Sequence, residues 1–144
     1  MLSAGSKAPA VSLLLELLSR GPVLLVFYKI SCPVCQMTLP FLERIARGSL
    51  QIVAISQDDA AATRRFQEKF GVTMRTLFDS EEEGYPASNA FGIEYVPSLF
   101  LVEPDGTVSL TSEGFVKDDL ESIAARAALP IFRAEESVPA WKAG

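Results

Sequence analysis

The sequence predicts one α/β domain built on a mixed β-sheet. In the first half of the chain, apolar strand-like runs alternate with helical patterns, an order that favours parallel strands joined by right-handed crossovers. In the second half, Pro104-Asp105-Gly106 is a hairpin signal, so residues 107–111 are expected to return antiparallel to the preceding strand. A chain of 144 residues fits one domain, and a domain of this size buries roughly 68–70% of its surface.

Residues 23–47 are the central stretch of the chain. Val23 to Tyr28 form an unbroken apolar and aromatic run, as expected for a strand that is covered on both faces. Cys32-Pro33-Val34-Cys35 follows, and a helical pattern continues to residue 47. Because the missing N–H of proline would have no partner at the first helical position anyway, Pro33 is expected to start this helix, with Cys32 as its N-cap.

The N-cap position gives Cys32 a chemical character of its own. Its sulfur is expected to lie close to the free N–H groups of Val34 and Cys35, and these donors and the helix dipole favour a thiolate. A helix terminus is worth roughly 0.3–1 kcal/mol, so a strong effect would need direct hydrogen bonds or a cation such as Lys29. Cys35, one turn further on, can reach the same sulfur. The sequence therefore predicts an exposed nucleophile with a second thiol within disulfide range.

The remaining elements follow from periodicity and from capping residues. Asp58 and Asp59 are expected to cap a helix that Gly71 stops, and Ser12 is a candidate cap of the first helix. The helical period continues past Pro40, which predicts one kinked helix. The expected helices span residues 12–20, 33–47, about 60–70, 85–91 and 117–128, and the expected strands span residues 23–28, 50–56, 76–78, 95–102 and 107–111.

Several of these features together resemble the thioredoxin superfamily. They are the strand followed by CPVC, Pro40 five residues after Cys35, the opening residues 5–9 (GSKAP) and Val96-Pro97 before a later strand. Within that superfamily the chain resembles the thioredoxin-like TlpA/ResA and AhpC/TSA-type proteins, from about Gly5 to Leu129. The resemblance implies a thioredoxin-like fold: a central mixed β-sheet flanked by helices, here with an N-terminal extension and a central insertion. Residues 1–144 then form one domain, with residues 130–144 as a C-terminal tail.

The resemblance also implies a role for Val96 and Pro97. In thioredoxin-like proteins the corresponding proline follows a cis peptide bond and packs against the CxxC motif, and the residue before it pairs through its backbone with the substrate. From the residues alone, Pro97 would be an ordinary trans proline at a strand edge, because cis bonds are a small minority. The combined pattern favours cis. Pro33, Val34 and Tyr28, the last expected near the mouth of the site, complete the supporting residues.

Two positions depart from the thioredoxin pattern. Thioredoxins usually carry a buried acid in the strand, six residues before the first cysteine, and a tryptophan directly before that cysteine. Here these positions are Val26 and Ser31. The usual proton acceptor for Cys35 is therefore missing, and water or another acid, such as Glu94, is left to take its place.

The CxxC motif itself has three interpretations. A redox dithiol is favoured, and it needs no cofactor other than its own reversible Cys32–Cys35 disulfide. A zinc half-site would need four sulfurs from a dimer, since the chain has two cysteines and no histidine. An inert structural disulfide would close a short loop and contribute little entropic stabilisation. No metal site is therefore predicted.

The function expected from this motif is thiol–disulfide exchange. The Cys32 thiolate attacks a substrate disulfide, and Cys35 then resolves the mixed disulfide. A glutaredoxin-like reaction with glutathione is a weaker alternative, prompted by the CPxC pattern. A redox-sensing or binding module on the same scaffold also remains open, since a fold does not fix a function.

A thiol peroxidase is the main alternative, because AhpC/TSA relatives include peroxiredoxins. Their peroxidatic cysteine is preceded by proline at seven residues and by threonine or serine at three. For Cys32 these positions hold Leu25 and Lys29, and for Cys35 they hold Tyr28 and Cys32. The peroxidatic pattern is absent.

Composition narrows the choice of partners. The net charge is −5 and there is no basic run, which disfavours nucleic acid and anionic membranes. The absence of histidine excludes Cys–His and Ser–His catalytic pairs within the chain. The expected partners are protein or small-molecule disulfides and thiols and a redox donor or acceptor protein, with the chain itself a monomer. Without a convincing signal peptide or a segment of transmembrane length, the expected location is the cytoplasm, or outside it if a leader was removed.

Overall fold

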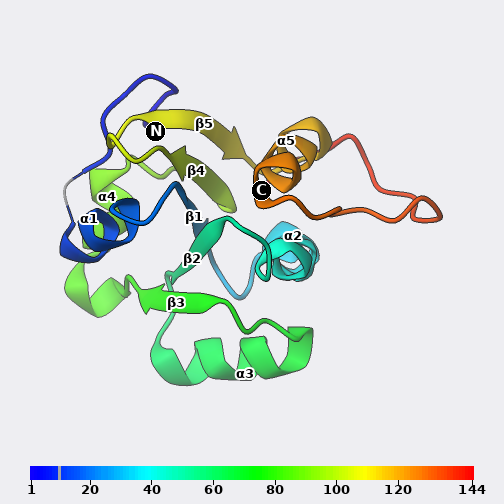
Figure 1. Ribbon diagram of the computed structural model, residues 1–144. Coiled ribbons are helices and arrows are strands. Elements are labelled where there is room, and N and C mark those ends of the chain that lie inside the picture. Colours follow the sequence, from blue (N-terminus) through cyan, green and yellow to red (C-terminus); the bar gives the residue numbers. More distant parts are fainter. Residues whose placement is uncertain (10) are drawn as a thin grey trace.

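The computed structural model describes residues 1–9 and 11–144, and its centre is a five-stranded mixed sheet of order β3-β2-β1-β4-β5 (Figure 1). β1 pairs in parallel with β2 and antiparallel with β4; β2 pairs in parallel with β3, and β4 antiparallel with β5. The mixed sheet predicted from the sequence is confirmed. The strands are β1 (Val23–Tyr28), β2 (Gln51–Ser56), β3 (Arg75–Phe78), β4 (Ser98–Val102) and β5 (Val108–Glu113).

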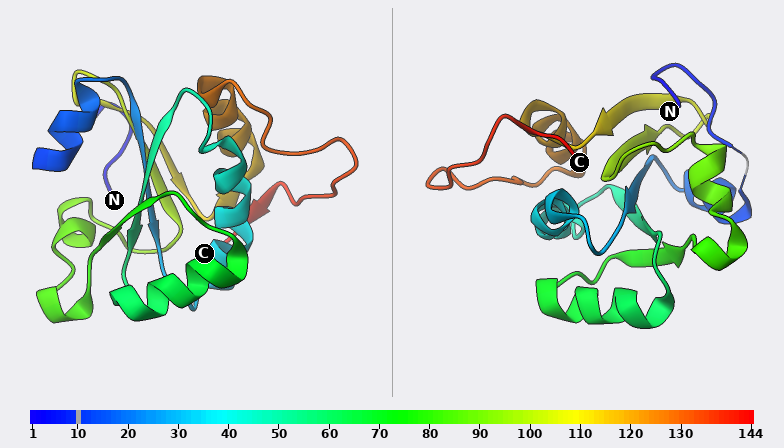
Figure 2. Two further views of the ribbon diagram at one scale, coloured as in Figure 1. Left: turned by 60° about the horizontal axis from the view of Figure 1, so that its bottom comes forward. Right: turned by 180° about the vertical axis from the view of Figure 1, so that it is seen from behind.

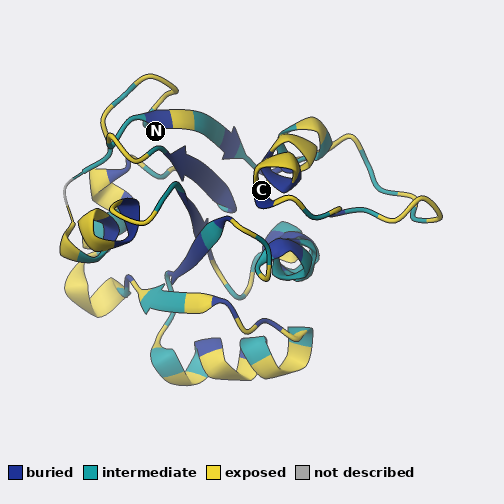
Figure 3. Ribbon diagram, in the orientation of Figure 1, coloured by how far each residue is buried: buried dark blue, intermediate teal, exposed yellow. Residues whose placement is uncertain are grey.

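Helices cover both faces of this sheet. α2 (Pro33–Ile45), α3 (Ala60–Phe70) and α5 (Lys117–Ala127) cover one face, and α1 (Ser12–Leu18) and α4 (Pro86–Ala90) cover the other (Figure 1). β1 lies between two strands and two helical layers, and all six of its residues are buried (Figure 3). Because side chains alternate along a strand, Leu24, Val26 and Tyr28 face the α2 side, whereas Val23, Leu25 and Phe27 face the α1 side.

Most element boundaries agree with the sequence to within two residues. α2 is continuous through Pro40, as expected, but ends at Ile45. The expected cap of α1 is wrong, because Ser12 is already helical and Val11 occupies the N-cap position. Asp59 alone caps α3, with its side chain accepting from the N–H of Ala62 at 2.8 Å, while Gly71 ends the helix in the left-handed conformation at φ 66°.

Between β3 and β4 the chain forms a 3₁₀ turn, Glu81–Glu83, and then α4. The carboxylate of the buried Asp79 accepts from the N–H groups of Ala87 and Ser88 at 2.8 and 2.7 Å. The residue at the N-cap of this short helix provides no side-chain cap. Asp79, directly after β3, therefore accepts the N–H groups at the start of the helix in its place.

Residues 130–144, for which the sequence predicts no element, pack back onto the domain. They leave α5, loop outward and return toward the sheet (Figure 2). There β7 (Trp141–Lys142) pairs antiparallel with β6 (Phe115–Val116), a short strand between β5 and α5. None of the helices in the described ranges is long and apolar enough to span a bilayer.

Candidate redox site

The two cysteines lie where β1 ends and α2 begins, as the sequence predicts. Both are free thiols; Cys32 is half-buried and the side chain of Cys35 is fully buried. Cys32 is the N-cap of α2, and its Sγ accepts the backbone N–H of Cys35 at 3.2 Å. A hydrogen bond of this kind stabilises negative charge on sulfur, so the local geometry favours Cys32 as the nucleophile.

The connection that carries Cys32 is fixed from two other elements. The Gln36 side chain, in α2, donates to the carbonyl oxygen of Ile30 at 2.9 Å, and the N–H of Ile30 donates to the carboxylate of Asp58 at 2.8 Å. Within the connection, the N–H of Cys32 donates to the carbonyl oxygen of Lys29 at 3.2 Å. These bonds hold the sulfur in place before any substrate arrives, as a positioned nucleophile requires.

Val96 and Pro97 stand beside the thiols. The Val96–Pro97 peptide bond is cis, so the isomer favoured from the sequence is confirmed. Cys32 Sγ lies 3.5 Å from the carbonyl oxygen of Val96, close enough for its thiol to donate a hydrogen bond. Pro97 is buried behind this contact, and Val34 is half-buried against the core on the α2 side, while Pro33 is exposed.

Cys35 is held as a thiol. Burial raises its pKa above the ordinary thiol range, and the sulfur of Cys32, which accepts its proton, raises it further; the charge of Asp58 acts in the same direction, against an opposing contribution from the backbone of Lys29. Two neighbouring thiols in such different surroundings have different chemistry. The buried one keeps its proton until the other has reacted.

Tyr28 does not lie at the mouth of the site, so that expectation is wrong. Its side chain is fully buried and packs on Phe66, with the ring centroids 5.4 Å apart. Burial raises the pKa of Tyr28 to about 12. Within residues 1–9 and 11–144, its hydroxyl finds no hydrogen-bond partner. Because a strand residue inside a two-layered core has no path to solvent, Tyr28 forms part of the wall behind Cys35.

The sequence missed the carboxylate that acts on Cys35. Val26 is buried and apolar, as expected, and Glu94 is exposed in the hollow above Cys32. Asp58 is the acid whose charge affects the pKa of Cys35. The available signal was topological: Asp58 follows β2, and the carboxyl ends of neighbouring parallel strands meet at one edge of a sheet.

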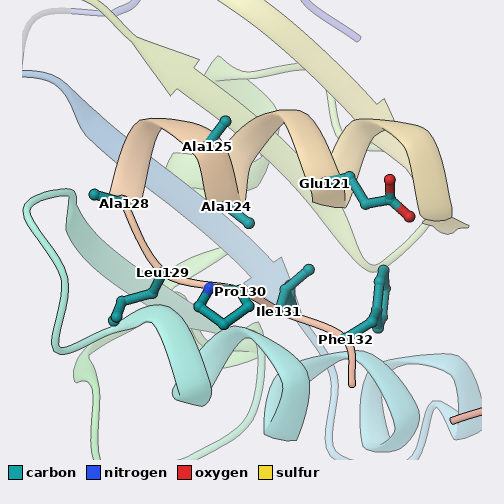
Figure 4. Close-up of a pocket in the computed structure, with 8 residues that line it drawn as sticks. All are labelled: Glu121, Ala124, Ala125, Ala128, Leu129, Pro130, Ile131 and Phe132. Carbon is teal, nitrogen blue, oxygen red and sulfur yellow. The ribbon is translucent and has the colours of Figure 1, made fainter. Parts of the chain in front are cut away.

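A surface hollow of about 330 Å³ opens over the thiols. Cys32 and Pro33 form part of its lining, together with Lys29, Gln57, residues 93–96 and Gly144. A second hollow, of about 440 Å³, lies between α5 and residues 129–132, and neither cysteine contributes to it (Figure 4). The reactive sulfur therefore faces the first hollow.

The described residues contain no group of three or more His, Cys, Asp or Glu side chains arranged to hold a metal ion. What the site offers is two thiols in contact, one accessible and positioned at a helix N-terminus, the other buried behind it. Such a dithiol can form and break a disulfide by exchange.

A thioredoxin-like sheet with a CxxC motif at the start of α2 and a cis-proline beside it defines a class of thiol-based redox folds. The chain belongs to the AhpC/TSA family, whose model matches residues 7–111. It is 26% identical over 112 residues to the thiol-disulfide oxidoreductase ResA of Geobacillus thermodenitrificans, a match that covers 70% of this chain and 62% of ResA. The family expected from the sequence is confirmed.

Solved structures agree on the fold. A protein assigned as the thiol:disulfide interchange protein DsbE of Chlorobium tepidum is 23% identical with a TM-score of 0.72, covering 90% of this chain and 100% of that one. The thioredoxin domain of a Bacteroides vulgatus thiol-disulfide oxidoreductase is 19% identical with a TM-score of 0.73, covering 88% and 98%. The chain spans between 49% and 62% of the length of the curated relatives that it matches.

Proposed function

We propose that this chain is a thiol–disulfide oxidoreductase that uses Cys32 and Cys35 as a redox dithiol. The observation that carries the proposal is the asymmetry of the pair. The half-buried Cys32 Sγ accepts an N–H at the start of α2, whereas the Cys35 thiol is fully buried and its pKa is raised. The oxidoreductase names of the curated relatives support the same activity.

The reaction runs in two displacements. The Cys32 thiolate attacks one sulfur of a substrate disulfide, and the other sulfur leaves as a thiolate, which gives a mixed disulfide at Cys32. Cys35 then loses its proton and attacks Cys32 Sγ, which expels the second substrate thiolate and leaves a Cys32–Cys35 disulfide. Two electrons pass to the substrate, and a thiol donor must return them. Run backwards, the same steps donate the disulfide.

The mixed disulfide removes one restraint on Cys35. Before it forms, the Cys32 sulfur accepts the Cys35 proton and raises its pKa. Once that sulfur is bonded to substrate, it carries no charge and accepts hydrogen bonds weakly. The resolving thiol is then easier to ionise. Asp58, whose charge opposes this ionisation, is the nearby acid that could take the proton through water.

The other site residues position the substrate or support the two cysteines, and none of them takes part in the exchange of sulfur bonds. The carbonyl oxygen of Val96 faces Cys32 Sγ and Pro97 backs it, so we assign both to substrate positioning. Pro33 supplies the helix start, and Val34 packs the first turn of α2 against the core. Tyr28 supports the buried side of Cys35 and does not contact substrate.

The proposed partners are disulfide or thiol substrates and a thiol donor or acceptor protein. No cofactor is proposed beyond the Cys32–Cys35 disulfide itself. A monomer that binds neither nucleic acid nor membranes remains a prediction. So does the cytoplasmic location, with an extracytoplasmic one as its alternative.

Single replacements of the two cysteines separate their roles. Cys32→Ser is expected to lower disulfide reduction by at least about a hundredfold, because the attacking sulfur is lost. Cys35→Ser is expected to accumulate a covalent mixed disulfide with substrate, visible as added mass that a reductant removes. Each variant is the control for the other, since both change one sulfur to oxygen. Full activity in Cys32→Ser would overturn the proposal.

A thiol peroxidase remains the second candidate because the family match itself favours it. The structure adds a steric point: Leu25 and Tyr28, which stand where a peroxidatic site would hold proline, are both buried in β1. Hydroperoxide consumption with dithiothreitol as donor tests this candidate. Fast consumption together with negligible disulfide exchange would replace the first proposal.

A further inference from the structure

Residues 140–144, here called the strap, lie along the residues that join β5 to α5. The N–H of Lys117 donates to the carbonyl oxygen of Ala140 at 2.9 Å. Val116 then pairs with Trp141, and Phe115 with Lys142. This antiparallel pairing directs the strap toward the thiol site.

Gly144, in the strap, lies against the carbonyl group that faces Cys32. A Cβ atom added at Gly144 would collide with the carbonyl oxygen of Val96 and would lie 2.7 Å from its carbonyl carbon. The same oxygen is 3.5 Å from Cys32 Sγ. Only a residue without a side chain permits so close an approach of two backbones. Gly144 accordingly lines the hollow over the reactive sulfur.

A second glycine shapes the seat of the strap. A Cβ atom at Gly114 would collide with the carbonyl oxygen of Lys142 and lie 3.3 Å from the nitrogen of Gly144. The strap thus touches the domain backbone to backbone at both Gly114 and Val96. This contact fills the space directly beside the backbone of Val96.

The occupied space limits what can reach Cys32. An extended polypeptide that places its disulfide against Cys32 must continue past the sulfur in both directions, and neighbouring strands need about 4.7–4.9 Å between them. Beside Val96 that place is taken by Gly144. The remaining hollow, about 330 Å³, has Lys29, Gln57 and Glu94 beside apolar lining residues, and its size suits a small molecule.

The strap is held by few contacts. All five of its residues are exposed, and the Trp141 side chain keeps 62% of its surface in solvent. Its ladder is two residues long. The preceding segment is fixed separately, because the Arg44 guanidinium binds the Glu136 carboxylate through two 2.7 Å contacts. Release of the strap would therefore be local and would leave residues 131–136 in place.

We propose that the strap sets substrate class: while it is seated, Cys32 exchanges with low-molecular-weight disulfides, and polypeptide disulfides react only after it lifts. This inference rests on the proposed function. With glutathione disulfide, the Cys32 thiolate displaces one glutathione thiolate, Cys35 displaces the second, and dithiothreitol reduces the resulting Cys32–Cys35 disulfide.

Lys117→Pro tests the proposal at a distance from the thiols. Lys117 is the first residue of α5, where proline is tolerated, and Val116 before it is already extended, at φ −123° and ψ 106°. The substitution removes the N–H that holds Ala140 and leaves the helix intact. Lys117→Ala is the matched control, because it keeps that N–H.

The readout is the ratio of two rates, insulin reduction over glutathione disulfide reduction. In Lys117→Pro this ratio is expected to rise about two- to tenfold, the range that one backbone hydrogen bond contributes to an equilibrium constant. Lys117→Ala should keep the wild-type ratio. Gly144→Val, which cannot seat against Val96, is expected to raise the ratio as well. An unchanged ratio in both Lys117→Pro and Gly144→Val would overturn the proposal.

A second readout separates this proposal from the proposed function. The reduced protein is alkylated at Cys32 with iodoacetamide or with a maleimide on a polyethylene glycol chain. Lys117→Pro should accelerate the polymer reagent about two- to tenfold relative to iodoacetamide. If wild type reduces neither disulfide but Lys117→Pro still shows this acceleration, the strap gates Cys32 and the proposed function fails. No acceleration would mean that the strap does not gate Cys32.

Discussion

At the scale of single residues, the two thiols differ because their surroundings differ. Cys32 has the N–H of Cys35 at 3.2 Å and an opening to solvent, whereas Cys35 is fully buried. The sequence predicts the first difference, since the position of Pro33 defines the N-cap. It cannot predict the second, because burial of Cys35 depends on side chains that other elements bring to it.

Asp58 and Asp59 allow a matched test of the charge that acts on Cys35. Burial is the main cause of the raised Cys35 pKa, and Asp58→Asn keeps an oxygen for the Ile30 N–H but removes a charge that adds a smaller contribution in the same direction. In a Cys32→Ser background, alkylation of Cys35 should therefore begin at lower pH than with Asp58 present. Asp59→Asn is the control, because that side chain caps α3. A profile that Asp58→Asn leaves unmoved would remove Asp58 from the site.

The raised pKa of Tyr28 predicts that the stability of the fold decreases at alkaline pH. Its pKa is about 12 in the folded chain against 10.0 for a free phenol, because burial disfavours the phenolate. The folded state thus holds this proton more tightly than the unfolded state. The resulting stability, at most about 2.7 kcal/mol for two pKa units, is present below pH 10 and is lost as pH rises toward 12.

Ultraviolet absorbance measures the ionisation directly. One of the three tyrosines of the chain should ionise only as pH approaches 12, and Tyr28→Phe should lose that step. The same variant should be no less stable than wild type at neutral pH, since the Tyr28 hydroxyl has no hydrogen-bond partner in the described part of the chain. A late step that persists in Tyr28→Phe would assign it to another group.

At the scale of elements, the sequence predicts what depends on local pattern. β1, β2, α2 and α3 follow from apolar runs, helical periodicity and capping residues, and the hairpin before β5 follows from its turn. The pairing of β6 with β7 has no such signal. Each strand is two residues long, and the paired residues lie far apart in the sequence: Phe115 and Lys142 are 27 positions apart.

The same distinction explains which contacts of the site the sequence predicts. Cys32, Pro33 and Cys35 are adjacent in sequence, so their geometry follows from one helix start. The contact of Cys32 with Val96 required a resemblance to known proteins, because 64 residues separate them. The contact of Gly144 with Val96 is predicted neither by adjacency in sequence nor by the resemblance. Only the folded backbone reveals that a side chain at residue 144 would collide with Val96.

At the scale of the whole molecule, one ion pair joins the helix of the thiols to the C-terminal segment. Arg44, in the last turn of α2, also donates to the carbonyl oxygen of Ile131 at 3.0 Å and lies 4.7 Å from the ring centroid of Phe41. Phe41 packs in turn on Phe132, with ring centroids 5.0 Å apart. The segment before the strap is therefore fixed to α2 by charge and by aromatic packing together.

This arrangement predicts a specific acid sensitivity. The hydrogen bonds from Arg44, followed by the N–H of Arg133, lower the pKa of Glu136 to about 2 from an ordinary 4.5. Because the folded pKa is depressed, the stabilisation is present above pH 4.5 and is lost as pH falls toward 2. Glu136→Gln should lower the melting temperature at pH 7 by a few degrees at most, as expected for a half-exposed pair. The difference from wild type should shrink at pH 3 and disappear near pH 2.

Glu135→Gln is the control for this experiment, since it removes one neighbouring carboxylate without a hydrogen bond to Arg44. Hydrogen exchange supplies the local readout: amides of residues 131–136 should lose protection in Glu136→Gln, whereas those of β1 and β4 should not. Equal melting temperatures for Glu136→Gln and wild type at every pH, with unchanged exchange, would mean that aromatic packing alone holds the segment on α2. Loss of protection across the whole sheet would instead mean that this ion pair supports the entire domain and not one segment of it.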